Sequence, residues 1–366
     1  MTGTKTRVFT VNPVDPDEQS LEAASGILRR GGLVAFPTET VYGLGADATS
    51  DGAVARIFEA KGRPQDNPLI VHVHTYDVVP ALVRELPSRA EVLMYRFWPG
   101  PLTIVLKKSG ALAERVSPGL DTVGVRMPAH AVALGLIKAA GVPVAAPSAN
   151  VSGRPSPTTP AHVLRDLDGR IDAVVDGGPC GIGVESTVLD LTTIPPAILR
   201  PGGTTREAIE EVLGDVVVDA VTAVTGEGAP RSPGMKYRHY APAAQVYLVE
   251  TGADGRADAL ERFAADFRGR GLKVGVLASS EKTSAAARSD REFHDAGDPE
   301  GVVWIDAGSE SDLASIAHGL FDNLRRFDDL GVDVVLAQAF SETGMGLAIM
   351  NRLLKAAGGR VLRGET

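Results

Sequence analysis

The chain has 366 residues, 44% hydrophobic and 23% charged, which is too long for one typical core and suggests two globular domains. Its formal net charge of −9 argues against broad adhesion to nucleic acid or anionic lipid, so an anionic ligand would need a local basic cluster. The single cysteine, Cys180, excludes an intrachain disulfide framework. The sequence shows neither a signal peptide nor an apolar run of membrane-spanning length, and we expect a cytoplasmic protein.

The first part of the chain mixes helical and strand patterns without strict alternation. Helices are expected at residues 17–32, 51–60, 88–97, 129–140, 159–167 and 207–213. Strands are expected at residues 33–36, 68–73, 102–107, 122–126, 142–146, 173–176, 186–190 and 197–200. This order favours a mixed, twisted sheet with flanking helices over a regular parallel sheet.

The composition changes over residues 214–243, where small residues lead into a stretch rich in Gly and Pro, GEGAPRSPGMKYRHYAPAA. Such a composition is typical of a linker. A simple tether does not need the run from Lys236 to Tyr240, KYRHY. We therefore expect one domain at 1–213, a linker with a further role at 214–243, and a second domain at 244–366.

The second domain has a simpler pattern, in which strands and helices alternate. Strands are expected at 246–249, 273–278, 302–306 and 334–337, and helices at 257–268, 311–327 and 347–357. Alternation of this kind predicts a small parallel α/β domain of Rossmann-like layout. The first turn, residues 250–255, lacks the GxGxxG spacing, so a dinucleotide site is not predicted.

A basic pair, Lys61 and Arg63, stands between a predicted helix and Pro64. Arg offers a planar fork and Lys a point charge, and two cations from one loop suit phosphate oxygens. The polar residues 65–67 that follow strengthen this interpretation. A solvated basic pair is the alternative.

Four further residues near strand ends have two interpretations each. Thr38 and Thr40 follow a buried strand and would either bind a ligand or cap the turn. His72 lies on an apolar strand, where a core histidine is the alternative to a ligand contact. Arg126 ends another buried strand and needs an anion, which a ligand or a structural carboxylate would supply.

Two small-residue segments present hydroxyl groups at strand ends. In Val144-Ala-Ala-Pro-Ser-Ala-Asn, small residues would let a ligand approach the backbone beside Ser148 and Asn150. The GxSxG spacing of a nucleophile elbow is absent, and no His-containing motif surrounds Cys180, so these groups are interpreted as hydrogen-bonding rather than nucleophilic. The same arrangement recurs at residues 185–187 and 200–203.

Together these segments resemble the threonylcarbamoyl-AMP synthase family, in the two-domain form that has a YrdC-type catalytic domain. The matching text is FPTETVYGLG, KGRPQDNPLIVHV, FWPGPLTIVL, VGVRMP, APSANVSG, GVESTVLD, LRPGG and SPGMKYRHYAP. The similarity covers most of residues 17–243 and continues weakly through the C-terminal domain. It implies a YrdC-like domain followed by a smaller Rossmann-like domain.

The resemblance implies that the chain is a nucleotidyltransferase. L-Threonine, bicarbonate and ATP would give threonylcarbamoyl-AMP and pyrophosphate, for modification of position 37 in tRNAs that decode ANN codons. The product would pass to a tRNA threonylcarbamoyl transferase. Mg²⁺ would accompany ATP, without a tightly bound organic cofactor.

The same resemblance assigns residues to the two substrates. Threonine would be held by Thr40, His72, Arg126, the backbone of Ala146, and Ser186. ATP would be held by Lys61, Arg63, Asn67, Thr122, Ser148, Ser156 and Arg200, with Lys61 and Arg63 the candidate catalytic groups. Tyr237 or Tyr240 of the linker would close over ATP as a lid; the resemblance does not say which.

Two other functions remain as alternatives. One is a related carbamoyl-transfer enzyme that embeds this fold among acylphosphatase and zinc modules, but the chain has no CxxC spacing. The other is a non-catalytic RNA-binding module, which the acidic total charge disfavours. Weak direct contact with tRNA is compatible with either the enzyme or the module.

Overall fold

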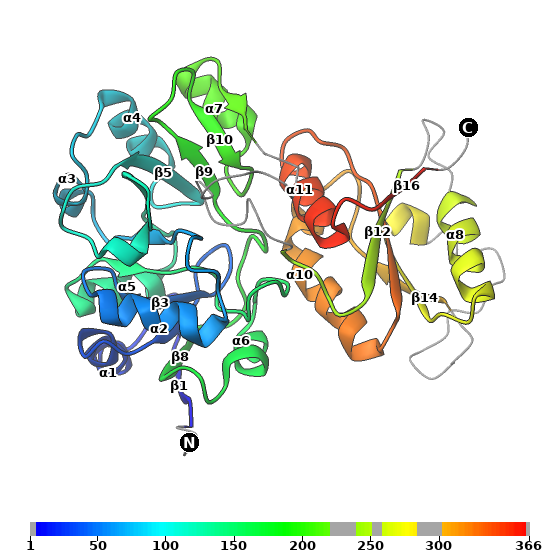
Figure 1. Cartoon of the computed structure of the whole chain (residues 1–366), viewed down its shortest axis with the longest axis horizontal. Helices are drawn as coiled ribbons and strands as arrows, with labels where there is room; N and C mark the ends of the chain where they lie inside the picture. Colours follow the sequence, from blue (N-terminus) through cyan, green and yellow to red (C-terminus); the bar gives the residue numbers. More distant parts are fainter. Residues whose placement is uncertain (1–4, 220–238, 251–257, 284–301, 364–366) are drawn as a thin grey trace. The chain divides into compact units, whose positions relative to one another are not determined.

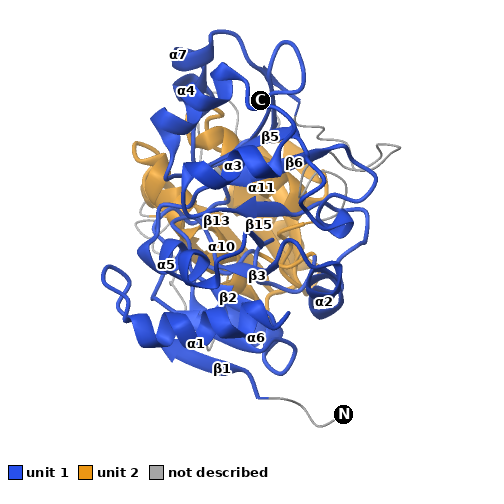
Figure 2. Ribbon diagram, turned by 90° about the vertical axis from the view of Figure 1, so that its left-hand side faces the viewer, with its two compact units in different colours: residues 1–152, 156–221, 225–236 blue, residues 153–155, 222–224, 237–366 orange. Residues whose placement is uncertain are grey.

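The computed structural model describes residues 5–219, 239–250, 258–283 and 302–363 of the chain. These residues form two compact units, which Figure 2 draws in blue and orange. The first unit holds the described residues up to 219 except Gly153–Pro155, and the second holds Gly153–Pro155 and the described residues from 239 onward. Each unit is an α/β structure with its own sheet.

The first unit is built on an eleven-stranded sheet that mixes parallel and antiparallel pairs, which confirms the predicted mixed sheet. In spatial order its strands are β1 (Arg7–Thr10), β8 (Ala173–Asp176), β2 (Val34–Phe36), β3 (Gly43–Asp47), β7 (Val144–Ala145), β4 (Ile70–His72), β6 (Thr122–Arg126), β5 (Leu102–Lys107), β9 (Thr187–Asp190), β10 (Ala197–Arg200) and β11 (Val217–Val218). Parallel neighbours include β4 with β6 and β5 with β9, whereas β7 runs antiparallel to β4.

Helices flank this sheet (Figure 1). They are α1 (Glu18–Arg29), α2 (Asp51–Lys61), α3 (Val79–Leu82), α4 (Ser88–Phe97), α5 (Ala131–Ala140), α6 (Pro160–Leu167) and α7 (Arg206–Leu213), with short 3₁₀ turns η1 (Tyr76–Val78) and η2 (Glu114–Val116). Helix α1 packs against α5, and α4 against α7.

Both faces of the sheet are buried along β2, because alternate residues enter different apolar clusters. Val34 and Phe36 pack with residues of α1 and α5, whereas Ala35 packs with residues of α2. A ligand therefore cannot reach the middle of this part of the sheet, and the loops at the strand ends are left to form a site.

The local sequence explains how α2 delivers its last residue to one such loop. Ser50 caps the helix start by accepting a hydrogen bond from the Ala53 amide. Gly62 ends the helix in the left-handed conformation, with φ of 60°. The turn at Gly62 places Lys61 on the last helical position and Arg63 just beyond it.

Three strands of this sheet, β1, β3 and β11, are not among those predicted from the sequence. Residues 43–47, two of which are glycine, form a strand paired antiparallel with β2. The packing explains the glycine: a Cβ at Gly45 would lie 2.8 Å from both Phe36 Cε1 and Val144 Cγ1. Glycine is thus required by close packing of the sheet rather than by a turn.

The second unit has a five-stranded sheet in which every pair is parallel, as the alternating pattern predicted. In spatial order the strands are β14 (Val302–Asp306), β13 (Val274–Ala278), β15 (Val334–Gln338), β12 (Gln245–Glu250) and β16 (Val361–Arg363). Its described helices are α8 (Asp258–Gly269), α10 (Leu313–Leu330) and α11 (Gly346–Ala357).

The predicted linker at 214–243 is described only at its two ends. Its first residues include β11, which pairs with β10 in the first unit. At its other end Tyr240 is 4% exposed, has φ of 65°, and stacks on Phe321 with the ring centroids 5.3 Å apart. Tyr237, one of the two candidate lid residues, lies outside the described residues. None of the helices in the described ranges is long and apolar enough to cross a bilayer.

Candidate active site at the strand ends

Three of the residues assigned to threonine meet where strands β4 and β6 of the first sheet end. His72 and Arg126 end the parallel neighbours β4 and β6 and are direct register partners. The loop after β2 reaches the same place, because Arg126 Nη2 donates a hydrogen bond to Thr40 Oγ1 over 3.0 Å. Arg126 Nε donates to the Gly100 carbonyl over 3.2 Å, which fixes the guanidinium plane.

His72 is an uncharged imidazole in this site. Burial, followed by the charge of Arg126, lowers the pKa of His72 to about 3. Its ring packs edge-on against Phe36, with centroids 6.2 Å apart, and Nδ1 has no hydrogen-bond partner among the described residues. A neutral ring with one free nitrogen can donate to or accept from a polar ligand.

The remaining residues assigned to threonine lie on neighbouring strands. Ala146 follows β7, and its amide donates to the Ile70 carbonyl of β4 over 2.9 Å. Ser186 precedes β9, and its hydroxyl lies 2.8 Å from Thr103 Oγ1 on β5. Since β5 separates β9 from β6, Ser186 lies two strands away from Arg126.

Glu39 also lies in this cluster, although no role is predicted for it from the sequence. Its Oε2 lies 2.7 Å from Arg126 Nη2, and the two side chains are 12% and 5% exposed. Glu39 thus supplies Arg126 with a carboxylate from the chain itself, which was the alternative to a ligand. No sequence pattern indicates this pair, because a Glu between two Thr residues in a turn usually faces solvent.

Lys61 is buried and held by main-chain oxygens, so it is not a solvated surface cation. It is 1% exposed, and its Nζ donates to the carbonyls of Ser148 and Asn150, each over 2.5 Å. The Ser148 hydroxyl donates in turn to Asn150 Oδ1 over 2.5 Å. The structure therefore joins two residues assigned to ATP, Lys61 and Ser148.

Arg63 shapes the loop that follows α2. It is 8% exposed and donates from Nε to the Asn67 carbonyl over 3.1 Å and from Nη2 to the Pro68 carbonyl over 2.8 Å. Asn67 is buried as well, and its Oδ1 accepts no hydrogen bond from the described residues. A buried amide oxygen without a donor is costly unless a ligand or water supplies one.

Residues 185 and 186 connect the remaining assigned groups. Arg200 donates from Nη2 to the Ser186 carbonyl over 3.0 Å and to its hydroxyl over 3.2 Å. The Ser156 hydroxyl donates to Glu185 Oε1 over 2.6 Å. Arg200, assigned to ATP, thus contacts Ser186, which is assigned to threonine, and Ser156, also assigned to ATP, contacts the residue before it.

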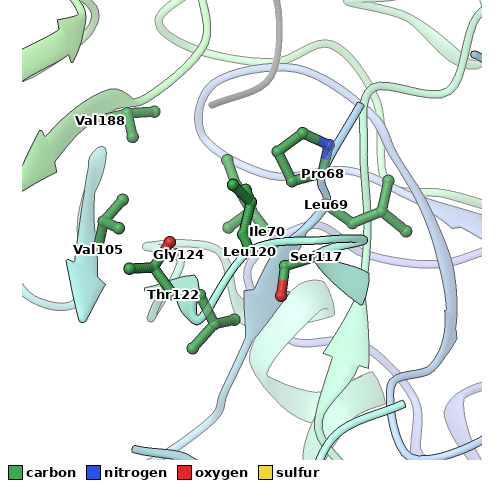
Figure 3. A pocket seen from close by; sticks show the side chains of 10 residues that line it. Pro68, Leu69, Ile70, Val105, Ser117, Leu120, Thr122, Gly124 and Val188 are labelled. Atoms are coloured by element: carbon green, nitrogen blue, oxygen red, sulfur yellow. The ribbon is translucent and has the colours of Figure 1, made fainter. Parts of the chain in front are cut away.

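Thr122 lines a small cavity at the start of β6 (Figure 3). The cavity has a volume of about 10 Å³, and most of its lining is aliphatic, including Pro68, Ile70 and Val188. The lining side chains with hydroxyls are Thr122 and Ser117. Ser117 is 1% exposed, and its hydroxyl has no partner among the described residues. A cavity of this volume has room for about one water molecule beside the two hydroxyls.

Cys180 lies close to the same cluster but is poorly suited to act as a nucleophile. It is 1% exposed, and burial raises the pKa of its thiol to about 12. The thiol therefore stays protonated near neutral pH. Within the described ranges, no three His, Cys, Asp or Glu side chains come together as a metal site would require.

Comparison with known proteins identifies the family. Residues 26–202 match a family model for Sua5, YciO and YrdC described as telomere recombination, and residues 204–358 match the threonylcarbamoyl-AMP synthase C-terminal domain. The threonylcarbamoyl-AMP synthase of Pyrococcus abyssi is 48% identical over 347 residues, which cover 95% of this chain and 96% of that protein. The chain belongs to the threonylcarbamoyl-AMP synthase family.

Other members of this synthase family agree over the full length. The threonylcarbamoyl-AMP synthase of Bacillus subtilis is 48% identical over 367 residues, covering 98% of this chain and all of that protein. The crystal structure of Pyrococcus abyssi Sua5 complexed with L-threonine matches with a TM-score of 0.89 and 46% identity, over 98% of this chain and 100% of that one. End-to-end agreement favours the synthase over the alternative in which the fold is embedded among acylphosphatase and zinc modules.

Proposed function

We propose that this chain is an L-threonylcarbamoyladenylate synthase, which converts L-threonine, bicarbonate and ATP into threonylcarbamoyl-AMP and pyrophosphate. The observation that carries the proposal is that Thr40, His72 and Arg126 lie together at the ends of β4 and β6. Family membership supports it, since the Pyrococcus abyssi relative was crystallised with L-threonine.

The cluster around Arg126 suits a small amino acid with a hydroxyl side chain. The guanidinium would bind the carboxylate, and the groups with free hydrogen-bonding capacity nearby include His72 Nδ1. Thr40, the Ala146 backbone and Ser186 would complete the threonine site. Its small residues limit the size of the side chain that the site accepts.

ATP would occupy the adjoining loops. Lys61 and Arg63 fix the loops that would surround its phosphates, with Asn67, Ser148, Ser156 and Arg200 as further contacts. Thr122, at the start of β6, would be another contact for ATP. Mg²⁺ would enter as part of the MgATP substrate, since proteins commonly bind magnesium through substrate phosphates.

The chemistry would be that of a nucleotidyltransferase. Threonine is first carboxylated on its nitrogen, and an oxygen of the N-carboxylate then attacks the α-phosphorus of ATP in line, expelling pyrophosphate. Such a reaction depends on positioning and on neutralising charge, and it needs no protein nucleophile. The protonated thiol of Cys180 agrees with a mechanism of that kind.

The product would serve tRNA modification. Threonylcarbamoyl-AMP is a mixed anhydride, which is activated for transfer to a nucleophile such as an adenosine amino group. We therefore infer that a tRNA threonylcarbamoyl transferase receives it for position 37 of tRNAs that decode ANN codons. Direct contact between this chain and tRNA is not required for that transfer.

The decisive assay is pyrophosphate release by the purified full chain. We expect release from ATP only when both threonine and bicarbonate are present, with threonylcarbamoyl-AMP detected by mass spectrometry. Pyrophosphate release independent of threonine would contradict the proposal. A gel shift with tRNA at physiological salt tests the RNA-binding alternative, which requires a complex even without ATP and threonine.

A further inference from the structure

The residues so far assigned to threonine do not match the charges of that substrate. Threonine carries an anionic carboxylate and a cationic ammonium group at neutral pH. The assigned set contains one cation, Arg126, whereas Thr40, His72, Ala146 and Ser186 are uncharged. A buried zwitterion is bound best when each charge has a partner.

Glu39 is the carboxylate that the structure places in this cluster. Both of its oxygens are shielded from solvent, and neither accepts a hydrogen bond from the described residues. Oε2 lies 2.7 Å from Arg126 Nη2, but the contact is an ion pair without hydrogen-bond geometry. A buried carboxylate normally accepts several hydrogen bonds, so Glu39 is left with acceptor capacity that a ligand can use.

Arg126 likewise keeps part of its binding capacity. Nε is committed to the Gly100 carbonyl and Nη2 to Thr40 and Glu39. Nη1 donates to no acceptor in the described part of the chain. Glu39 and Arg126 thus present an acceptor and a donor side by side, as the two ends of an α-amino acid would require.

We propose that Glu39 binds the ammonium group of threonine and takes the proton that this group loses when its nitrogen is carboxylated. The inference rests on the proposed function. In the step, Glu39 first accepts one proton from the ammonium group, which frees the lone pair of the nitrogen. The amine then attacks the carbon of bicarbonate, the new C–N bond forms, one C–O bond breaks, and the departing hydroxide takes a second proton from the nitrogen and leaves as water. Threonine, bicarbonate and the Glu39 carboxylate thus give the N-carboxylate, water and a neutral Glu39.

The groups around Glu39 favour this role. Arg126 faces Glu39 from β6, and His130 faces it from the start of α5. Cys180 also lies close enough to interact electrostatically with Glu39. Burial lowers the pKa of His130 despite the opposing charge of Glu39, and the Cys180 thiol is held protonated. His72, beyond Arg126, is uncharged as well. Threonine's own carboxylate would neutralise Arg126, which leaves Glu39 as the partner of the ammonium group.

A ligand pair separates this role from a purely structural one. Binding of L-threonine and of 3-hydroxybutanoate, which lacks the ammonium group, is measured by calorimetry for the full chain and for Glu39→Gln. The variant keeps the size of the side chain and removes its charge. We expect threonine binding to weaken about ten- to a hundredfold, while 3-hydroxybutanoate binds equally well or more tightly. Equal or tighter threonine binding in the variant would mean that Glu39 is only a counter-ion that the substrate displaces from Arg126.

The proton-acceptor role has its own readout in the pH dependence of the rate. In Glu39→Gln we expect kcat/KM for threonine to rise about tenfold per pH unit below the pKa of the threonine amino group, since only the free amine reacts. The unchanged chain should show a much flatter profile, and parallel profiles would overturn the proton-acceptor role.

Glu59→Gln, an exposed change on α2, is the matched control. If the unchanged chain makes no threonylcarbamoyl-AMP, the proposed function fails; if it does and Glu39→Gln behaves like it, only this inference fails.

Discussion

Lys61 Nζ donates a hydrogen bond to the Ser148 main-chain oxygen over 2.5 Å, which ties the end of α2 to the loop after β7. The partners are 87 residues apart in the chain, and Lys61 is 1% exposed. The ammonium group therefore organises a loop as well as supplying charge. Both roles bear on what its removal does.

Lys61→Ala should lower both stability and activity. The change leaves the carbonyls of Ser148 and Asn150 without their donor, at a cost of about 1–3 kcal/mol each unless water replaces it. We expect a clear fall in the denaturation midpoint together with at least tenfold slower adenylate formation. Lys138→Ala, an exposed change in the last turn of α5, is the control. An unchanged midpoint in Lys61→Ala would show that the bond to Ser148 contributes little.

The assignment of Thr122 to ATP predicts an effect specific to that substrate. Thr122→Val removes one hydroxyl at the start of β6 and keeps the size of the side chain. A neutral hydrogen bond contributes about 0.5–1.5 kcal/mol, so KM for ATP should rise roughly two- to tenfold. KM for threonine should stay constant, and the exposed change Ser88→Ala should alter neither. Increases in both KM values would contradict the assignment of Thr122 to ATP.

The mixed character of the first sheet could be predicted because its helices and strands intermingle, and the parallel second sheet because they alternate. The strand Gly43–Asp47 could not, since glycine reads as a turn residue and the need for it at Gly45 comes from Phe36 and Val144. That constraint involves a residue about a hundred positions away. No local pattern encodes such a contact.

The candidate site shows the same division. Lys61, Arg126 and the strand-end hydroxyls stood out because their residue types are unusual beside buried strands. Glu39 did not stand out, because its burial depends on β6 approaching the loop after β2. The sequence also suggested that Arg126 needs an anion, but it could not choose between a ligand and a carboxylate of the chain.

His72 predicts how stability depends on pH. Its pKa falls from 6.5 to about 3 on folding, because the ring is buried and lies beside Arg126. The unfolded chain then binds a proton below about pH 6.5 that the folded chain does not, so stability is full above that pH and is lost as the pH falls toward 3. The contribution lost is about 1.4 kcal/mol per pH unit. Urea denaturation of the full chain and of His72→Gln at pH 7 and pH 5 should show a smaller loss in the variant, whereas equal losses would contradict a buried neutral ring.

Tyr240 can be tested without disturbing its packing. Its ring stacks on Phe321 and lies 5.5 Å from the Arg352 guanidinium carbon, so Tyr240→Ala would remove buried contacts in the second unit. Tyr240→Phe keeps the ring and removes only the hydroxyl. If that hydroxyl binds ATP, KM for ATP should rise roughly two- to tenfold with an unchanged denaturation midpoint. Wild-type kinetics in Tyr240→Phe would leave Tyr237 as the candidate lid tyrosine.

Arg126→Lys tests the carboxylate end of the threonine site. The guanidinium bonds to Gly100 and Thr40 while pairing with Glu39, and one ammonium group cannot reproduce that fork. We expect threonine affinity to fall about ten- to a hundredfold in calorimetry, with Arg96→Lys, an exposed change on α4, as the control. Because 3-hydroxybutanoate shares the carboxylate, its affinity should fall by a similar factor, unlike its response to Glu39→Gln. Unchanged affinity for both ligands would remove Arg126 from the site, and a loss confined to threonine would mean that Arg126 acts through the ammonium partner instead of on the carboxylate.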